Sequence, residues 1–151
     1  MLKEIVHIGL TISDIEESIK FYRDILGLKL TGRITMTGEE TDKLFNCKNT
    51  KVNIAYLIGT DEIISPPIEL IEFESKEIER VESSLMRTSI SELCFSVDDI
   101  NKFYKHLKEN NIECISEPQK FDFSEFGFGK SKALYFKDPD GIILEELEAL
   151  E

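Results

Sequence analysis

The start of the chain alternates between apolar and polar positions and then changes to a helical period. In 5–12 every second residue is apolar, which predicts a strand with one apolar face. That face consists of Val6, Ile8, Leu10 and Ile12. In 15–26 the apolar residues recur at helical spacing, with Ser13 or Asp14 as the N-cap and Gly27 as the end. The opening therefore predicts a strand that leads into a helix.

Three further strands are predicted before the middle of the chain. The segment 29–35 reads as a strand, 51–58 alternates cleanly, and 68–73 follows a loop that contains glycine and two prolines. Between the first two strands, 37–46 predicts a short helix or an irregular arm, with Thr37 as its cap. The first half thus reads as strand, helix and three strands.

A polar stretch without a strand pattern, 75–91, predicts a connector, after which the opening pattern returns. An alternating strand is followed by an acidic cap, Asp98-Asp99, and by an amphipathic helix that ends near Asn110-Asn111. The remaining predicted elements are a strand at 112–115, an aromatic and glycine loop at 121–130, a strand at 132–136, a turn at 138–141 and a last strand at 142–147.

Matching the two halves aligns chemically reactive positions. Glu92 falls opposite His7, and Glu145 falls opposite Glu69. The chain is therefore predicted to be a duplicated unit, with modules at 1–74 and 91–151 joined by a connector at 75–90.

His7 and Glu69 are the candidate functional residues of the first half. His7 lies on the less apolar face of its strand, beside a glycine that leaves room. A lone histidine in a strand is usually structural, so the residue alone decides nothing. Glu69 shares a strand face with Ile71 and Phe73, where an acid is costly unless it is paired, protonated or bound to a metal. Glu69 therefore needs a partner.

Charge and cysteine content narrow the function classes. The net charge is −12, from 30 acidic and 18 basic residues, which disfavours nucleic acid and anionic membranes as partners. We see no membrane-spanning run and no signal peptide. The odd cysteine number predicts buried thiols in a reducing cytoplasm, and neither a disulfide framework nor a zinc knuckle. These cysteines are Cys47, Cys94 and Cys114.

Four segments together resemble the vicinal oxygen chelate superfamily, which includes glyoxalase I, methylmalonyl-CoA epimerase, extradiol dioxygenases and bleomycin- or fosfomycin-resistance proteins. They are HIGLTISDIEESIKFYRDILGLKL, PPIELIEF, ELCFSVDDI and YFKDPDGIILEELE, and they span both halves. The resemblance implies an α+β fold of two βαβββ modules that form an open, curled mixed β-sheet cleft. It also implies a homodimer, with the cleft either within one chain or across two.

The same resemblance implies a metal site. Carried over by position, the ligands would be His7, Glu69, Glu92 and Glu145, and Glu92 departs from the histidine common in the family. One imidazole and three carboxylates suit Mn²⁺, Fe²⁺, Ni²⁺ or Mg²⁺, with Zn²⁺ still open. Glu92 could instead be a displaced base, or an acid paired with Arg87 or a lysine in a site without metal.

The implied reaction is an isomerisation of a small oxygenated substrate. In a lactoylglutathione lyase-like or epimerase-like enzyme, Glu92 or Glu145 would remove a proton next to a carbonyl to give an enediolate. A single histidine disfavours extradiol chemistry. The alternative is a metal-free antibiotic-binding protein, which the negative charge and the aromatic loop would suit, and a regulatory module with a dead site is a third reading. Four aromatic residues could line a substrate pocket: Tyr56, Phe123, Phe126 and Phe128.

Overall fold

The computed structural model describes residues 2–59, 65–74 and 77–150 of the 151-residue chain. It divides into two units, Met1–Arg80 and Val81–Glu151, each built on a four-stranded mixed sheet. The division falls inside the stretch that the sequence marks as a connector, and the described part of that stretch forms neither helix nor strand.

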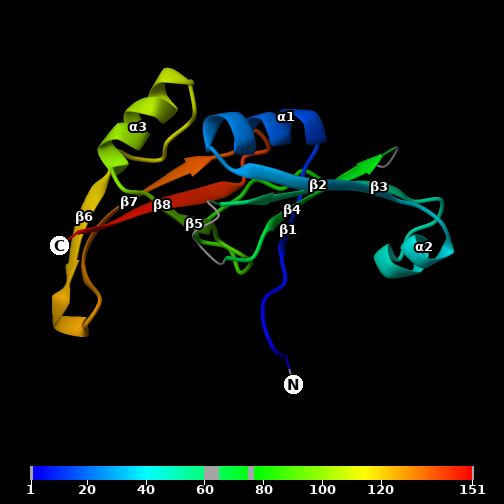
Figure 1. Ribbon diagram of the computed structural model, residues 1–151, viewed down its shortest axis with the longest axis horizontal. Helices are drawn as coiled ribbons and strands as arrows, with labels where there is room; N and C mark the ends of the chain where they lie inside the picture. Colours follow the sequence, from blue (N-terminus) through cyan, green and yellow to red (C-terminus); the bar gives the residue numbers. More distant parts are fainter. Residues whose placement is uncertain (1, 60–64, 75–76, 151) are drawn as a thin grey trace. The chain divides into compact units, whose positions relative to one another are not determined.

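The N-terminal unit has the strand order β1-β4-β3-β2 (Figure 1). β1 (Ile8–Thr11) runs parallel to β4 (Ile68–Glu74), and the other neighbours are antiparallel. β3 (Lys51–Ile58) lies between β4 and the edge strand β2 (Lys29–Met36). The strands predicted from alternation are confirmed in this unit, apart from small differences at their ends.

The helix of this unit covers one face of the sheet. α1 (Ile15–Lys20) begins at Asp14, whose carboxylate accepts hydrogen bonds from two backbone N–H groups of the first turn. A π-helical turn, η1 (Phe21–Ile25), continues it, and the chain reverses at Gly27 with φ +78°. Tyr22 of this turn is fully buried. The predicted cap and stop are both confirmed.

A short second helix, α2 (Glu39–Phe45), follows β2. Its N-cap is Gly38, not Thr37, and no side chain caps it. Gly38 has φ +99°, a conformation that glycine adopts without the steric cost of a Cβ atom. Phe45 meets Phe73 edge to face, with ring centroids 5.2 Å apart, and so fixes the helix against the end of β4.

The C-terminal unit repeats the sheet order as β5-β8-β7-β6. β5 (Leu93–Ser96) is parallel to β8 (Ile143–Leu150), whereas β7 (Gly129–Lys137) and β6 (Gln119–Phe123) continue the sheet with antiparallel pairing. α3 (Ile100–Glu109) begins at Asp99, as predicted, and packs against the sheet through Phe103, whose ring centroid lies 6.0 Å from that of Phe136. Figure 1 shows α3 running beside β7 and β8.

Two predicted segments of this unit are wrong. The stretch 112–115 forms no strand and contributes one isolated bridge, from Cys114 to Phe136. The stretch 121–130 is not a loop, because it contains the end of β6, a short 3₁₀ turn η2 (Ser124–Phe126) and the start of β7. Edge pairing of the backbone with β7 makes β6 a strand although all its side chains are exposed.

Each unit has its own hydrophobic core between sheet and helix. In the N-terminal unit this core contains Leu10, Ile19, Tyr22, Leu57 and Leu70. In the C-terminal unit it contains Ile100, Leu107, Leu134, Phe136 and Leu144. Alternation along a strand sends every second side chain to this core and the others to the opposite face. The opposite face of each sheet is where the candidate site residues lie.

The predicted α+β fold of two βαβββ modules is confirmed, and each sheet is open. No helix among the described residues is long and apolar enough to span a membrane. The three cysteines are free, as predicted, but the prediction that they are buried is wrong. Cys47 and Cys94 are exposed and Cys114 is half-buried.

Candidate functional site

The N-terminal unit places Glu69 in the middle of its sheet. β4 pairs on both sides, so that Gly9 of β1 and Tyr56 of β3 are the direct neighbours of Glu69. Residues paired in this way project from the same face of a sheet. That face is opposite to α1, since Leu70, the next residue of β4, is buried in the core.

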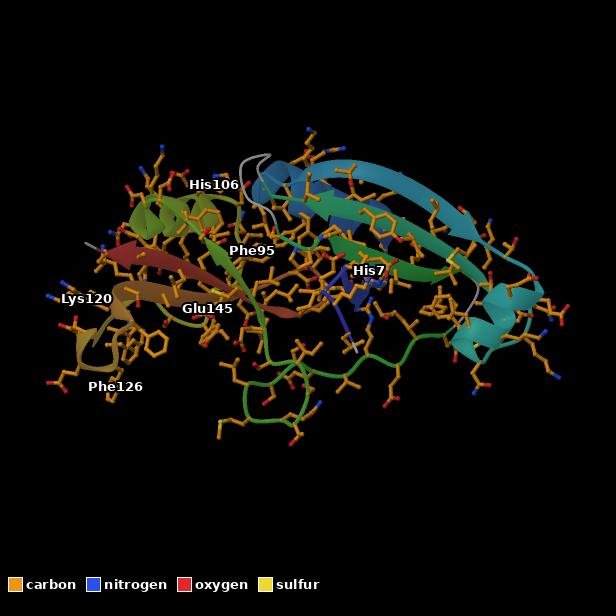
Figure 2. All side chains as sticks on the ribbon, turned by 60° about the horizontal axis from the view of Figure 1, so that its bottom comes forward. His7, Phe95, His106, Lys120, Phe126 and Glu145 are labelled. Carbon is orange, nitrogen blue, oxygen red and sulfur yellow. The ribbon has the colours of Figure 1, made fainter. Side chains whose placement is uncertain are left out.

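Two side chains satisfy the Glu69 carboxylate. The Tyr56 hydroxyl donates a hydrogen bond to Oε1 at 2.6 Å, and His7 Nε2 lies 3.2 Å from Oε2. The Glu69 side chain is 10% exposed and that of His7 is 43% exposed. His7 directly precedes β1 and is labelled in Figure 2. The pair therefore offers one carboxylate oxygen and one imidazole nitrogen at the same point, the first held inside and the second open to solvent.

Gly9 leaves room for this arrangement. A Cβ atom at this position would lie 3.1 Å from Ile71 Cδ1 and 3.5 Å from Glu69 Oε2. The first distance is tighter than ordinary van der Waals contact, so any larger residue would press on the side chains around Glu69. The small residue between His7 and Glu69 thus preserves their approach.

The hydrogen bond to Glu69 also keeps the Tyr56 hydroxyl protonated. It raises the pKa of the Tyr56 hydroxyl to about 12, and loss of solvent around the ring adds to the effect. The hydroxyl therefore stays protonated over the physiological range. Tyr56 acts as a fixed donor that holds one carboxylate oxygen and leaves the other facing His7.

The C-terminal unit repeats this register around Glu145. Glu145 lies in β8 between Cys94 of β5 and Tyr135 of β7, as Glu69 lies between Gly9 and Tyr56. Glu92 directly precedes β5, as His7 directly precedes β1. The predicted correspondences of Glu92 with His7 and of Glu145 with Glu69 therefore agree with the strand pairing.

The second register differs from the first in its chemistry. Cys94 replaces a glycine, and its pKa is raised to about 12 by desolvation and by a hydrogen bond with Glu145. The pKa of Tyr135 is raised as well, first by desolvation and then by the charges of Glu145 and Glu92. The thiol therefore remains protonated at neutral pH, which disfavours Cys94 as a metal ligand.

Glu145 also lines a pocket of about 360 Å³ within the C-terminal unit. Phe121, Phe123 and Tyr135 form its aromatic part. Of the aromatic residues that the sequence suggested for a pocket, Phe123 lies in it, whereas Phe126 and Phe128 are exposed outside it. Figure 2 shows Phe126 at the tip of the β6–β7 hairpin, away from Glu145.

The four predicted ligands divide between the units. His7 and Glu69 meet in the N-terminal unit, while Glu92 and Glu145 belong to the C-terminal unit. Within either unit, the described residues hold no group of three or more metal-binding side chains. The convergence of all four residues on one cation stays a prediction.

Glu92 is not held by an ion pair in the part of the chain that the structure describes. The Arg87 guanidinium donates a hydrogen bond to the backbone carbonyl oxygen of Glu82, and none of the described ion pairs includes Glu92. The reading of Glu92 as a salt-bridged acid therefore gains no support.

Sequence reasoning missed the neighbours of the two central acids. Tyr56 was expected to line a pocket, and its contact with Glu69 was not foreseen. Tyr135 was not singled out, and Cys94 was named only as one of the three predicted buried thiols. The signal for them lies in the duplication, because aligning Glu145 with Glu69 and extending the register across the neighbouring strands identifies both residues.

The donor atoms present suit a divalent cation. An imidazole nitrogen and carboxylate oxygens are common ligands of Zn²⁺, Mn²⁺, Fe²⁺ and Ni²⁺. His7 Nε2 and Glu69 Oε2 lie 3.2 Å apart. The residues of the N-terminal unit therefore fit one half of a ligand set, and Glu92 and Glu145 supply the same donor class for the other half.

Comparison with known proteins agrees with this arrangement. A family model for the glyoxalase/bleomycin resistance protein/dioxygenase superfamily matches residues 4–145. Metallothiol transferase FosB of Staphylococcus haemolyticus is 32% identical over 145 residues, which cover 96% of this chain and 83% of that protein. Human mitochondrial methylmalonyl-CoA epimerase is 25% identical over 92% of this chain and 70% of its own length.

A solved structure supports the same fold. The crystal structure of a glyoxalase family protein from Bacillus cereus superposes with a TM-score of 0.85, at 20% identity, over 100% of this chain and 97% of the other. The family model, the relatives and this structure cover both modules of the duplicated chain. The protein therefore belongs to the glyoxalase/bleomycin resistance protein/dioxygenase superfamily.

Proposed function

We propose that the protein is a metal-dependent enzyme that isomerises a small oxygenated substrate through an enediolate, in the manner of a lactoylglutathione lyase or an epimerase. His7, Glu69, Glu92 and Glu145 would hold the divalent cation. The observation that carries the proposal is the paired geometry of His7 and Glu69 on the open sheet face, repeated in register by Glu92 and Glu145.

A bound divalent cation would polarise a substrate carbonyl and stabilise negative charge on its oxygen. The residues of the chain do the remaining work. Tyr56 fixes the Glu69 carboxylate through Oε1, so that Glu69 serves as a rigid ligand and not as a base. Glu145 lines the pocket, where its carboxylate can take the proton next to the carbonyl and return it to the neighbouring carbon. Glu92 is the alternative base.

A thiol transfer is the second candidate. The 32% identity to a metallothiol transferase over nearly the whole chain favours it. For this chain, a thiolate from a second substrate would form a bond to a carbon of the first substrate as a carbon–oxygen bond at that carbon breaks. The released oxygen would keep the electron pair, the same cation would stabilise its negative charge, and a proton would then neutralise it. Cys94 is not a candidate nucleophile, because its pKa of about 12 keeps the thiol protonated.

Metal content tests the proposal before any substrate is known. Protein purified without chelators should carry a stoichiometric divalent metal, measured by inductively coupled plasma mass spectrometry. His7→Ala and Glu145→Ala should each lose it. His106→Ala on α3 and Glu117→Ala on an exposed loop are the matched controls and should keep it.

Substrate screening then separates the reaction classes. For an isomerase, metal-loaded protein should exchange the α-proton of hemithioacetals or chiral 2-methyl thioesters with deuterated solvent, and Glu145→Gln should abolish this exchange. Formation of a new carbon–sulfur bond without α-exchange would favour thiol transfer. Two results would contradict the proposal of a metal-dependent enzyme: unchanged metal content in both His7→Ala and Glu145→Ala, or no metal in the wild type. Either result would favour a metal-free binding protein.

A further inference from the structure

We propose that the pocket beside Glu145 holds an aromatic ring of the substrate, and that Ala133 and Ser131 of β7 determine the space for that ring. This deepens the proposed function, on which it rests only for the claim that the bound molecule is the substrate. The pocket has a volume of about 360 Å³ and lies entirely within the C-terminal unit.

The open faces of the two sheets differ at two matching positions of β3 and β7. Two residues before the tyrosine that neighbours the central acid, β3 has Ile54 and β7 has Ala133. Four residues before the same tyrosine, β3 has Val52 and β7 has Ser131. In the first unit Ile54 and Val52 are 3% and 0% exposed, so branched side chains fill this part of the face. Alanine and serine are smaller, so the second unit is hollow where the first is filled.

Larger side chains rise from the strands on both sides of β7. Phe121 of β6 pairs with Ser131, and Leu147 of β8 pairs with Ala133. Paired residues project from the same face of a sheet, and all four line the pocket. Neighbouring strands are about 4.8 Å apart, which places the backbones of β6 and β8 about 10 Å from each other. The pocket is therefore a trough with β7 as its floor and walls from β6 and β8.

The wall from β6 is aromatic. The rings of Phe121 and Phe123 are stacked, with centroids 5.6 Å apart and an interplanar angle of 7°. They remain 41% and 43% exposed, although a phenyl ring gains free energy when it is buried. Tyr135 adds a third ring beside Glu145. Because aromatic rings attract a further ring beyond the free energy of burial, an aromatic group gains more here than an aliphatic group of the same size.

Size and polar groups narrow the occupant further. A volume of about 360 Å³ lies at the small end of ligand pockets, which suits one or two rings and not an extended conjugate. Ser116, Gln119 and Ser131 can donate hydrogen bonds to a hydroxyl or carbonyl oxygen. The preferred ligand is therefore a flat aromatic group of one or two rings that carries an oxygen substituent.

Two probes with the same carbon skeleton test the preference for an aromatic ring. 2-Naphthol is flat and aromatic, and decahydro-2-naphthol is its saturated counterpart. Each is titrated into full-length, chelator-treated protein, so that the hydroxyl cannot bind a metal, and binding is followed by the backbone amide shifts in ¹H–¹⁵N NMR spectra. We expect 2-naphthol to shift amides of β6, β7 and β8, and the saturated probe to bind about threefold or more weakly.

Variants of β7 test what sets the space. Ala133→Ile introduces the residue of the matching position in the first unit and should weaken 2-naphthol binding about tenfold or more, because its side chain occupies the place of the ring. Lys132→Ile is the matched control: it places an isoleucine on the opposite face of the same strand, outside the pocket, and should leave binding within about twofold. Circular dichroism melting checks folding. If Ala133→Ile does not fold, Ser131→Val decides, with an expected loss of about threefold or more.

Three results would overturn the inference: no shift of the β6, β7 and β8 amides by 2-naphthol, equal or tighter binding of the saturated probe, or wild-type binding in the folded β7 variant. These results are independent of metal content. If the wild type carries no metal while the probes and variants behave as expected, the proposed enzyme fails and the aromatic site stands. If His7→Ala loses the metal while Ala133→Ile binds 2-naphthol like the wild type, the aromatic site fails and the enzyme stands.

Discussion

Glu69 and Glu146 are both buried carboxylic acids of a central strand, and each offsets the cost of burial differently. Glu69 lies on the open face, where Tyr56 donates to one oxygen and His7 contacts the other. Glu146 faces the α3 side of its sheet, where Leu134 is its strand neighbour, and desolvation raises its pKa to about 8. Hydrogen-bonding partners offset the burial of the first acid, whereas burial keeps the second protonated at neutral pH.

We expect Tyr56→Phe to lower the free energy of unfolding by about 1–3 kcal/mol at pH 7, because a buried carboxylate loses a hydrogen bond. Urea denaturation of metal-free protein measures the change. Tyr135→Phe is the matched control: no hydrogen bond joins Tyr135 to Glu145 among the described residues, so a smaller loss is expected. Equal losses in the two variants would contradict this assignment.

The pH dependence of the Tyr56→Phe effect has a definite sign. The pKa of Tyr56 is raised from 10 to about 12 in the folded state, so its contribution is complete below pH 10 and is lost as the pH rises towards 12. The difference in unfolding free energy between wild type and variant should therefore shrink over this range. A difference that stays constant would show that the hydrogen bond does not control it.

Glu146→Leu should stabilise the protein at pH 8. Its folded pKa of about 8 lies above the ordinary 4.5, so the wild type gradually loses stability as the pH rises from 5 to 8. The expected slope is about 1.4 kcal/mol per pH unit. Leucine has no ionisable group, so this pH dependence should disappear in the variant. Leucine is also the buried residue at the corresponding position of the first unit, Leu70. Denaturation curves of chelator-treated protein at several pH values test this, with Glu117→Leu as an exposed control.

Sequence patterns revealed Glu69 but not Glu146, for a physical reason. Glu69 interrupts an apolar strand face, so the cost of burying it is visible from its neighbours. Glu146 lies in the acidic run LEELE, which reads equally well as a solvated edge. Only its register opposite Leu134 and Phe95 shows that it faces the buried side.

At the scale of elements, each unit starts its main helix with the same long-range contact. The carboxylate of Glu72 in β4 accepts a hydrogen bond from the backbone N–H of Ile15 at 3.0 Å. Glu148 in β8 accepts one from the backbone N–H of Ile100 at 3.1 Å. The first N–H groups of a helix lack partners within it, so an acid at this point is favourable. In each unit, the strand that comes last in the sequence, β4 or β8, thereby fixes the start of the helix that covers its sheet.

We expect Glu72→Ala to lower the free energy of unfolding by about 1–2 kcal/mol, the usual range for loss of a helix cap. Glu74→Ala on the same strand is the matched control. Its carboxylate pairs with Lys51 at the surface, and an exposed pair contributes about 0–1 kcal/mol. Urea denaturation at neutral pH compares the two, and an equal or larger loss for the control would contradict the role given to Glu72.

The elements of the first half were predictable because their strands lie against a core and show it by alternation. β6 was not, because its alternation is limited to two phenylalanines, Phe121 and Phe123, in a stretch whose glycines indicate a loop. β6 is a strand because its backbone pairs with β7, and the pattern of side chains does not reveal this pairing. The apolar residues of 112–115 suggested a strand from side chains alone. The backbone there pairs only at Cys114, in one isolated bridge with Phe136.

At the scale of the whole molecule, duplication divides the ligand set. Each unit supplies two of the predicted ligands, and neither holds a group of three within its described residues. A divalent transition metal needs about four ligands for a stable site, water included. The cation site proposed above, with four protein ligands, therefore draws on residues of both units, from one chain or from two. The correspondence of the candidate ligands between the two units was predictable from the duplication, whereas their convergence on one cation stays a prediction.

This dependence predicts that metal binding couples the two units. In hydrogen–deuterium exchange measured by mass spectrometry, Mn²⁺ should slow amide exchange in β1 and β4 and also in β5 and β8, because a ligand that binds only the folded state stabilises it by mass action. The substitution His7→Ala changes only the N-terminal unit, yet it should abolish the slowing of amide exchange by Mn²⁺ in β5 and β8 as well. His106→Ala should preserve both effects. If the C-terminal strands stay protected in His7→Ala, each unit binds metal separately and the shared site is wrong.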